Sequence, residues 1–206
     1  MKKHGKDEIT EVKPEDKKNV IIASILDWLI AIAIGVLVGV LMVVFVVQRD
    51  NVSGDSMLPN LRSGYVVMTD KVSTYFDNYD RGDIVILDGE NMVGYNHEEY
   101  LIKRIVGLPG ETVRIADGHV YIREPGAADF YMLEEPYLDV SVVTTVMSSG
   151  MERGYDEITL GEDEYYCLGD NRPVSNDSRN LGPFSADRIR GVAFVIIYPF
   201  NEFKFI

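Results

Sequence analysis

The sequence predicts a mainly β protein in which a single N-terminal transmembrane helix precedes an all-β domain. Two observations lead to this fold class. Residues 29–47 form an unbroken apolar run, which is typical of a helix that crosses a bilayer. After residue 49 the chain consists of short runs rich in Val, Ile and Tyr, separated by Gly, Asp and Pro turn signals. This pattern is typical of a β-barrel or β-sandwich.

Residues 19–48 are the predicted membrane anchor, and residues 1–18 are a polar tail of mixed charge. The uncharged run at 29–47 contains 19 residues. As a helix it spans about 28 Å, close to the thickness of a bilayer core. Trp28 suits the interfacial belt. Asp27 either lies at headgroup level or packs against another helix, and the first position is favoured because a carboxylate at the bilayer centre is costly. A buried core helix is the alternative, which the length of the run disfavours.

The charges that flank the anchor predict its orientation. Lys13, Lys17 and Lys18 precede it, and Arg49 alone follows it closely. Because Lys and Arg concentrate on the cytoplasmic side of membrane segments, the tail is expected in the cytoplasm and residues 51–206 outside. The apolar run is longer than that of a cleaved signal peptide, and no small-x-small site follows it. A retained anchor is therefore expected.

Composition excludes several classes of function. The 206 residues carry a net charge of −13 and include one cysteine and three histidines. A negative net charge disfavours nucleic acid as a partner. The single cysteine, Cys167, cannot form an intramolecular disulfide. So few Cys and His residues form no visible ligand cluster, and neither a metal nor another cofactor is expected.

The β-type runs of the outer domain predict its strands. Strands are expected at residues 64–68, 84–87, 100–106, 164–168 and 191–198. A hairpin is expected from 112–115 to 119–122, because the Asp117-Gly118 pair between these runs favours a tight turn. Residues 124–157 have weak periodicity and are expected to leave the main sheet.

Ser56 is the first candidate for chemistry. Gly54 and Asp55 precede it and Pro59 follows, so the backbone is shaped by a flexible residue on one side and a constrained one on the other. A serine in such a turn can expose both its hydroxyl and its backbone N–H, as a nucleophile with an oxyanion donor requires. A polar turn that joins anchor and domain is the alternative.

A nucleophilic serine needs a base. His4 lies in the tail, His97 in a polar loop and His119 in the hairpin, where each is expected to be a solvated surface residue. Lys103 lies inside the strand at 100–106, on the face of apolar alternate residues. It would act as a base only if burial removed about three pKa units. The alternative is a lysine whose apolar stem is buried and whose amine reaches water.

A third polar segment, residues 169–179, is dense in turn formers. Asp177 and Arg179 are placed to form an ion pair that fixes this loop. Ser175 is placed to orient a lysine amine by a hydrogen bond. A solvated loop is the alternative, since Asx and Ser turns are common.

Four segments together resemble those of bacterial type I signal peptidases, membrane-bound serine proteases with a Ser/Lys dyad. They are similar, in order after an anchor, to that family's conserved boxes: residues 53–61 (SGDSMLPNL), 81–85 (RGDIV), 103–111 (KRIVGLPGE) and 169–179 (GDNRPVSNDSR). Residues 112–165 carry little resemblance.

The resemblance implies that Ser56 is the nucleophile and its N–H an oxyanion donor, and that Lys103 is the general base. Ser175 would orient Lys103, while Asp170, Asp177 and Arg179 would hold the site. Some members carry a serine two residues before the nucleophile as a second oxyanion donor. Here Gly54 occupies that position, as in Gram-positive relatives, and the second donor is left to a backbone group or water.

The resemblance also implies the partners: exported precursors that bear a signal peptide, with membrane lipid around the anchor. The extended cleavage region would add as a strand between residues 51–54 and 100–102. Small side chains at the first and third positions before the cut would enter shallow apolar pockets. The residues expected to contact substrate are Val52, Ser53, Gly54, Asp55, Met57, Leu101 and Ile102.

Two alternatives stay open from the sequence. A LexA-type Ser/Lys autoprotease is related, but its members are soluble and carry a DNA-binding module. A non-catalytic β-domain tethered to the membrane, which binds envelope partners, would need no buried lysine.

Overall fold

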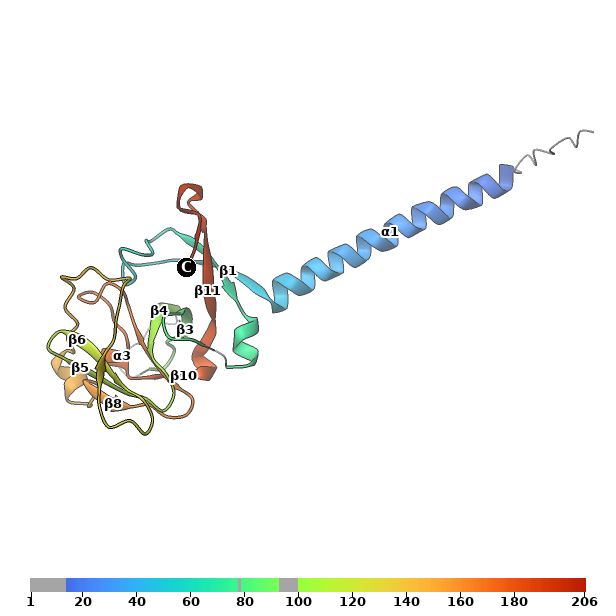
Figure 1. Ribbon diagram of the computed structural model, residues 1–206. Helices are drawn as coiled ribbons and strands as arrows, with labels where there is room; N and C mark the ends of the chain where they lie inside the picture. The colour runs from blue at the N-terminus through green and yellow to red at the C-terminus, as the bar shows by residue number, and fades with distance from the viewer. Residues whose placement is uncertain (1–13, 78, 93–99) are drawn as a thin grey trace, which may run out of the picture. The chain divides into compact units, whose positions relative to one another are not determined.

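The computed structural model describes residues 14–77, 79–92 and 100–206 (Figure 1). The chain divides into an N-terminal unit up to residue 44 and a second unit from residue 45 to 206. The first unit is helical and the second is built from antiparallel β-sheets. The predicted fold class, an apolar helix followed by an all-β domain, is confirmed.

Helix α1 runs from Pro14 to Phe45. It begins five residues before the predicted anchor, because proline at a helix start loses no helical hydrogen bond. Its segment Ile22–Phe45 has the length and composition of a membrane span, and its most apolar stretch is not buried against other parts of the described chain. The helix ends three residues before the predicted boundary at 48. Val47 and Gln48 belong instead to strand β1, where they pair with β2.

The larger sheet has the strand order β1-β2-β11-β3-β4-β9-β10, with β12 also paired to β11. All of its pairings are antiparallel. Its strands are β1 (Val47–Asn51), β2 (Val66–Asp70), β3 (Ile84–Asp88), β4 (Tyr100–Gly107), β9 (Glu164–Leu168), β10 (Phe184–Ser185), β11 (Ile189–Tyr198) and β12 (Lys204–Phe205). Five of these are the predicted strands, with ends displaced by up to two residues. The apolar pattern fails to predict the ends because strand pairing decides them.

The smaller sheet has the order β7-β6-β5-β8. It consists of β5 (Thr112–Ala116), β6 (His119–Arg123), β7 (Tyr131–Met132) and β8 (Glu157–Thr159), and Figure 1 shows β5, β6 and β8 grouped together. The predicted hairpin is β5–β6. Asp117 and Gly118 both have positive φ, as its two-residue turn requires. Much of the segment 124–157 lies outside regular structure, with β7 and β8 joined to the hairpin rather than to the larger sheet.

Short helical segments connect the strands. They are η1 (Val72–Tyr75), α2 (Ser148–Met151), α3 (Ser178–Leu181), η2 (Ala186–Arg188) and η3 (Phe200–Glu202). None exceeds four residues, which agrees with the absence of helical periodicity after the anchor.

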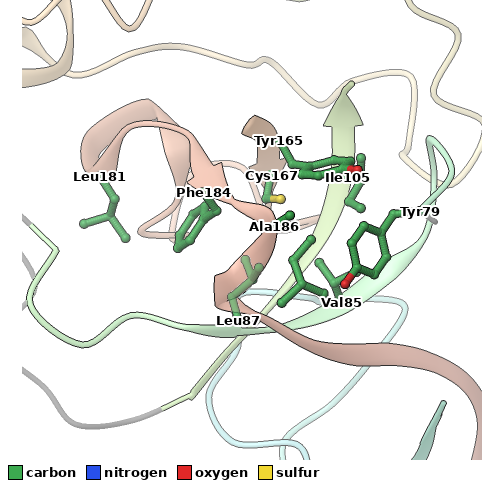
Figure 2. Packing of buried hydrophobic residues seen from close by; sticks show 10 residues of the cluster. Tyr79, Val85, Leu87, Ile105, Tyr165, Cys167, Leu181, Phe184 and Ala186 are labelled. Atoms are coloured by element: carbon green, nitrogen blue, oxygen red, sulfur yellow. The ribbon is translucent and has the colours of Figure 1, made fainter. Parts of the chain in front are cut away.

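Three clusters of buried side chains form the core of the β unit. Figure 2 shows one of them, in which Val85 and Leu87 of β3, Ile105 of β4 and Cys167 of β9 point into a common interior. The rings of Tyr79 and Tyr165 meet edge to face in the same cluster, with centroids 5.3 Å apart. This packing fixes β3, β4 and β9 relative to one another, and β4 carries Lys103.

Two strand edges next to the candidate site carry no partner strand in the described sheet. β1 ends the strand order and pairs only with β2. β4 pairs with β3 along residues 100–104, but with β9 only from Arg104 onward. The second edge of residues 100–103 is therefore open, and so is the outer edge of β1.

Candidate active site

Ser56 lies in the irregular segment between β1 and β2. The start of this segment is fixed by two backbone hydrogen bonds, from the Val52 N–H to Tyr65 O (2.8 Å) and from the Gly64 N–H to Val52 O (2.9 Å). Gly54 has a φ of +79°, a conformation that favours glycine. The Ser56 backbone N–H makes no hydrogen bond to another residue that the structure describes. The turn thus leaves both the hydroxyl and this N–H available.

Lys103 reaches Ser56 from β4. Its side chain is buried, with the residue only 2% exposed. The Lys103 Nζ lies 2.9 Å from Ser56 Oγ and donates a second hydrogen bond to Ile102 O at 2.8 Å. Sequence reasoning identified both residues, and the fold brings them together.

Burial lowers the pKa of Lys103 from 10.5 to about 8. Removal of water disfavours the charged ammonium, and this effect is larger than those of the neighbouring charges. Asp177 and Asp170 raise the pKa, whereas Arg179 lowers it. Because both carboxylates already pair with arginines, their pull on the amine is partly compensated.

The predicted ion pair between Asp177 and Arg179 is present. Arg179 Nε and Nη2 donate to the two carboxylate oxygens of Asp177 at 2.8 Å each, in the bidentate geometry that is strongest for this pair. Asp177 is fully buried, caps helix α3 and accepts a further hydrogen bond from the Gly169 N–H at 3.0 Å. The pair therefore ties α3 to the end of β9.

Asp170 makes a second bidentate ion pair, with Arg104. The distances are 2.9 Å from Nε and 2.7 Å from Nη2. Asn60 also donates to Asp170 at 2.8 Å. Because Arg104 follows Lys103 directly and Asn60 follows Ser56 by four residues, this cluster links both halves of the candidate dyad. Strand alternation puts Arg104 on the opposite face of β4 from Lys103, and no sequence pattern indicated its partner.

Asn171 holds the backbone on which Ser56 lies. Its N–H donates to Ser56 O at 2.9 Å, and its side-chain Nδ2 donates to Asp55 O at 3.0 Å. Gly169 also packs closely against the backbone of Ser56. A methyl group at its Cα would stand 2.5 Å from Ser56 O and 2.2 Å from Ser175 Oγ. Only glycine allows this approach.

The expected hydrogen bond between Ser175 and Lys103 is not present. The Ser175 hydroxyl is buried and has no hydrogen-bond partner among the residues that the structure describes. Its place beside Gly169 still puts it close to Ser56 O. Ser175 thus lies in the site but makes no hydrogen bond to the amine in this structure.

The segment 124–157 supplies contacts that sequence reasoning missed. The ring of Tyr137 lies under the Arg104 guanidinium, 4.1 Å from Cζ to the ring centroid, and Tyr137 O accepts from Asn60 at 3.0 Å. Glu135 forms an ion pair with Arg172, which is fully buried. No motif marked Tyr137 or Glu135, because their role depends on contacts between distant parts of the chain.

A cavity of about 520 Å³ opens beside Ser56 and Lys103. The residues that line it are Asp50, Asn51, Val52, Ser53, Gly54, Ser56, Val67, Ile86, Tyr100, Leu101, Ile102 and Lys103. Five of the seven residues expected to contact substrate are therefore on its wall. Asp55 and Met57 are not, and Met57 is buried in the core at 1% exposure. Its apolar side chain follows the serine in sequence, but the turn directs it inward.

Comparison with known proteins identifies the family. Residues 25–198 match the family model described as "Signal peptidase, peptidase S26". The chain belongs to this family. It is 34% identical over 189 residues to signal peptidase I S of Bacillus subtilis (strain 168), which covers 88% of this chain and 93% of that protein. It is 33% identical over 195 residues to signal peptidase I of Bacillus amyloliquefaciens, which covers 94% of this chain and 98% of that protein.

A crystal structure of a signal peptidase I from Enterococcus faecalis V583 is similar at 27% identity and a TM-score of 0.42, covering 56% of this chain and 96% of that one. Membership of the signal peptidase family makes the chain a serine endopeptidase that removes signal peptides, and with its apolar helix it is anchored in a membrane. Family membership favours a signal peptidase over both the LexA-type autoprotease and the non-catalytic tethered domain.

Proposed function

We propose that Ser56 and Lys103 form the catalytic dyad of this signal peptidase. One observation carries the assignment: a lysine amine, buried and with a lowered pKa, lies 2.9 Å from a serine hydroxyl at the wall of a cavity. A base must reach the proton that it removes and must itself be uncharged. Lys103 meets both conditions. With a pKa of about 8, roughly a tenth of the Lys103 amines are neutral at pH 7.

The reaction begins with neutral Lys103. Its amine takes the Ser56 proton as Oγ attacks the carbonyl carbon of the scissile bond. The oxyanion that forms accepts a hydrogen bond from the Ser56 N–H, which has no partner among the described residues. Lys103 then donates its proton to the leaving amine, and the acyl-enzyme remains. Water, deprotonated by Lys103, releases the acyl group.

The substrate adds as a strand in the cavity. Residues 51–54, which continue β1, line one side of the cavity and residues 100–102 line the other, and neither edge has a partner strand among the described residues. Both edges offer backbone donors and acceptors to an extended peptide. Val52, Ile86 and Ile102 form an apolar wall that suits small side chains at the first and third positions before the cut.

Four further residues hold the dyad in place. Asp170 and Asp177 anchor the segment that follows β9 through their ion pairs, the second with Arg179. Ser175 occupies the buried space beside this segment. Their role is to position the backbone around Ser56 and to set the electrostatic environment of Lys103.

The N-terminal tail lies in the cytoplasm and the β unit on the opposite side of the membrane. Lysines at 13, 17 and 18 precede the span, whereas Arg49 alone follows it closely. An exported precursor enters the membrane by its own apolar segment, and its cleavage site then lies on that opposite side. Enzyme and scissile bond then meet beside the same lipid surface.

Substitutions in the full-length protein in detergent test the dyad against a synthetic precursor with a small-x-small cleavage site. Ser56→Ala and Lys103→Ala should each lower kcat/KM by about a thousandfold or more. Lys103→Arg should be equally inactive, because a guanidinium does not lose its proton. Ser63→Ala and Lys204→Ala, both at exposed positions, are matched controls and should retain activity. Substantial cleavage by any of the dyad variants would refute the assignment.

A further inference from the structure

Asp50 places a carboxylate in the wall of the substrate cavity. It lies on β1, one strand residue before the open segment 51–54. Among the described residues that line the cavity, Asp50 is the only carboxylate, and Lys103 is the only basic residue. Since Lys103 is committed to Ser56, Asp50 is the charge that remains to meet the substrate.

The Asp50 carboxylate is held in a fixed orientation. Thr69 Oγ1, which is almost fully buried, donates to Oδ2 at 2.6 Å, and Gln48 Nε2 donates to Oδ1 at 2.7 Å. Each carboxylate oxygen has a further lone pair for another donor. No arginine or lysine pairs with Asp50 among the described residues. The group is thus oriented but not neutralised.

The alternation of β1 determines which substrate residue Asp50 meets. Asp50 is partly buried and Val52 is buried, whereas their neighbours Arg49 and Asn51 are exposed. Asp50 and Val52 therefore share the inner face, about 7 Å apart along the strand. A substrate strand alongside would advance two residues over the same length. If its third residue before the cut faces the apolar wall at Val52, its fifth faces Asp50.

We propose that Asp50 is a specificity-determining residue, which favours precursors with Lys or Arg at the fifth position before the scissile bond. The proposal rests on the substrate strand described under the proposed function. A basic side chain there places its charged end against an oriented carboxylate in the wall of the cavity. For a pair that is partly exposed, a preference of about 3- to 10-fold in kcat/KM is expected over an acidic residue.

Asp50 acts separately from the catalytic base. The titratable groups that act most on Lys103 are Asp177, Cys167, Asp170 and Arg179, and Asp50 is not among them. Removal of the Asp50 charge should therefore leave the pH profile of the reaction unchanged for a neutral substrate. A general disturbance of the site would move that profile.

The experiment uses the full-length protein in detergent and a set of synthetic peptides that differ at one position. The second, fourth, fifth and sixth positions before the cut carry Lys, Gln or Glu in turn, and the first and third positions keep small residues. Wild type should prefer Lys over Glu at the fifth position, and the preference should shrink at high salt. Asp50→Asn should abolish it, whereas Asp129→Asn, the same change at an exposed site outside the cavity wall, should keep it.

The outcomes separate this inference from the proposed function. Equal cleavage of the Lys and Glu peptides by wild type, a preference at a different position, or a preference that survives Asp50→Asn would overturn the role of Asp50 while leaving the dyad intact. Because the salt dependence is measured on wild type, the test holds even if Asp50→Asn folds poorly. Failure of wild type to cleave any peptide would instead refute the proposed function, and this inference with it.

Discussion

Replacement of Lys103 by Met should make the folded protein more stable at neutral pH while it abolishes activity. Methionine retains an unbranched apolar side chain in a site that is only 2% exposed, and it removes the amine. The wild-type protein must desolvate that amine on folding, which is why the pKa of Lys103 falls to about 8. A charged amine in this place is therefore a source of instability.

The two pKa values determine the size of the effect. The unfolded chain keeps the Lys103 proton up to about pH 10.5, whereas the folded protein loses it near pH 8. Below pH 8 the difference lowers wild-type stability by about 3 kcal/mol. Between pH 8 and 10.5 the unfolded state binds more protons than the folded state, so wild-type stability rises with pH over this interval. At pH 10 the burial of Lys103 still lowers the stability by about 1 kcal/mol.

The methionine variant also loses hydrogen bonds to Ser56 and Ile102, at about 1 kcal/mol each at any pH. Relative to wild type, it should be about 1 kcal/mol more stable at pH 7 and about 1 kcal/mol less stable at pH 10. Urea unfolding of both full-length proteins in one detergent, followed at the two pH values, measures this difference. A stability difference that stays constant between pH 7 and 10 would show that the Lys103 amine is not desolvated, and the argument for a neutral base would fail.

Three further predictions concern the same site. Wild-type kcat/KM on a neutral peptide should rise with pH through a pKa of about 8, the value for Lys103; a midpoint near 10.5 would contradict a buried base. Gly169→Ala should lower kcat/KM about a hundredfold, because the added methyl group displaces Ser56. Gly39→Ala is the control, since a methyl group there meets no other residue. Unchanged activity in Gly169→Ala would contradict the close approach of Gly169 to Ser56. Tyr137→Leu removes both the ring under Arg104 and the hydrogen bond from the hydroxyl to Glu135, and should lose about 2 kcal/mol of stability and several-fold activity. Tyr137→Phe keeps the ring and loses only that hydrogen bond, so it should lose about 1 kcal/mol and retain most of the activity. Equal losses in the two variants would contradict a role for the ring.

Much of the chain was predictable because its signals are local. The anchor follows from 19 uncharged residues in a row, and the β5–β6 hairpin follows from Asp117 and Gly118 between two β-type runs. The Asp177–Arg179 ion pair was predictable for the same reason, since its members are two residues apart in a turn-rich loop. The ends of α1 and β1 were not, because an apolar run suits both a helix and a strand until a neighbouring strand pairs with it.

Other features of the site depend on contacts between residues far apart in the chain. Arg104 and Asp170 are 66 residues apart, and Tyr137 joins them from a segment without a motif. The sequence predicted a hydrogen bond from Ser175 to Lys103, but the buried Ser175 hydroxyl makes no hydrogen bond to a described residue. Met57 was expected to contact substrate and is buried instead. Side-chain direction in a turn depends on the surrounding packing, which no sequence pattern expresses.

The sequence by itself determined the membrane anchor, the β class of the outer domain and the two candidate catalytic residues. It also determined the family, through four ordered segments. Only the tertiary structure decided that Ser56 and Lys103 meet, because they are 47 residues apart and strand register sets their distance. It also decided that the amine is buried enough to lose its proton near pH 8, since desolvation depends on every group packed around it.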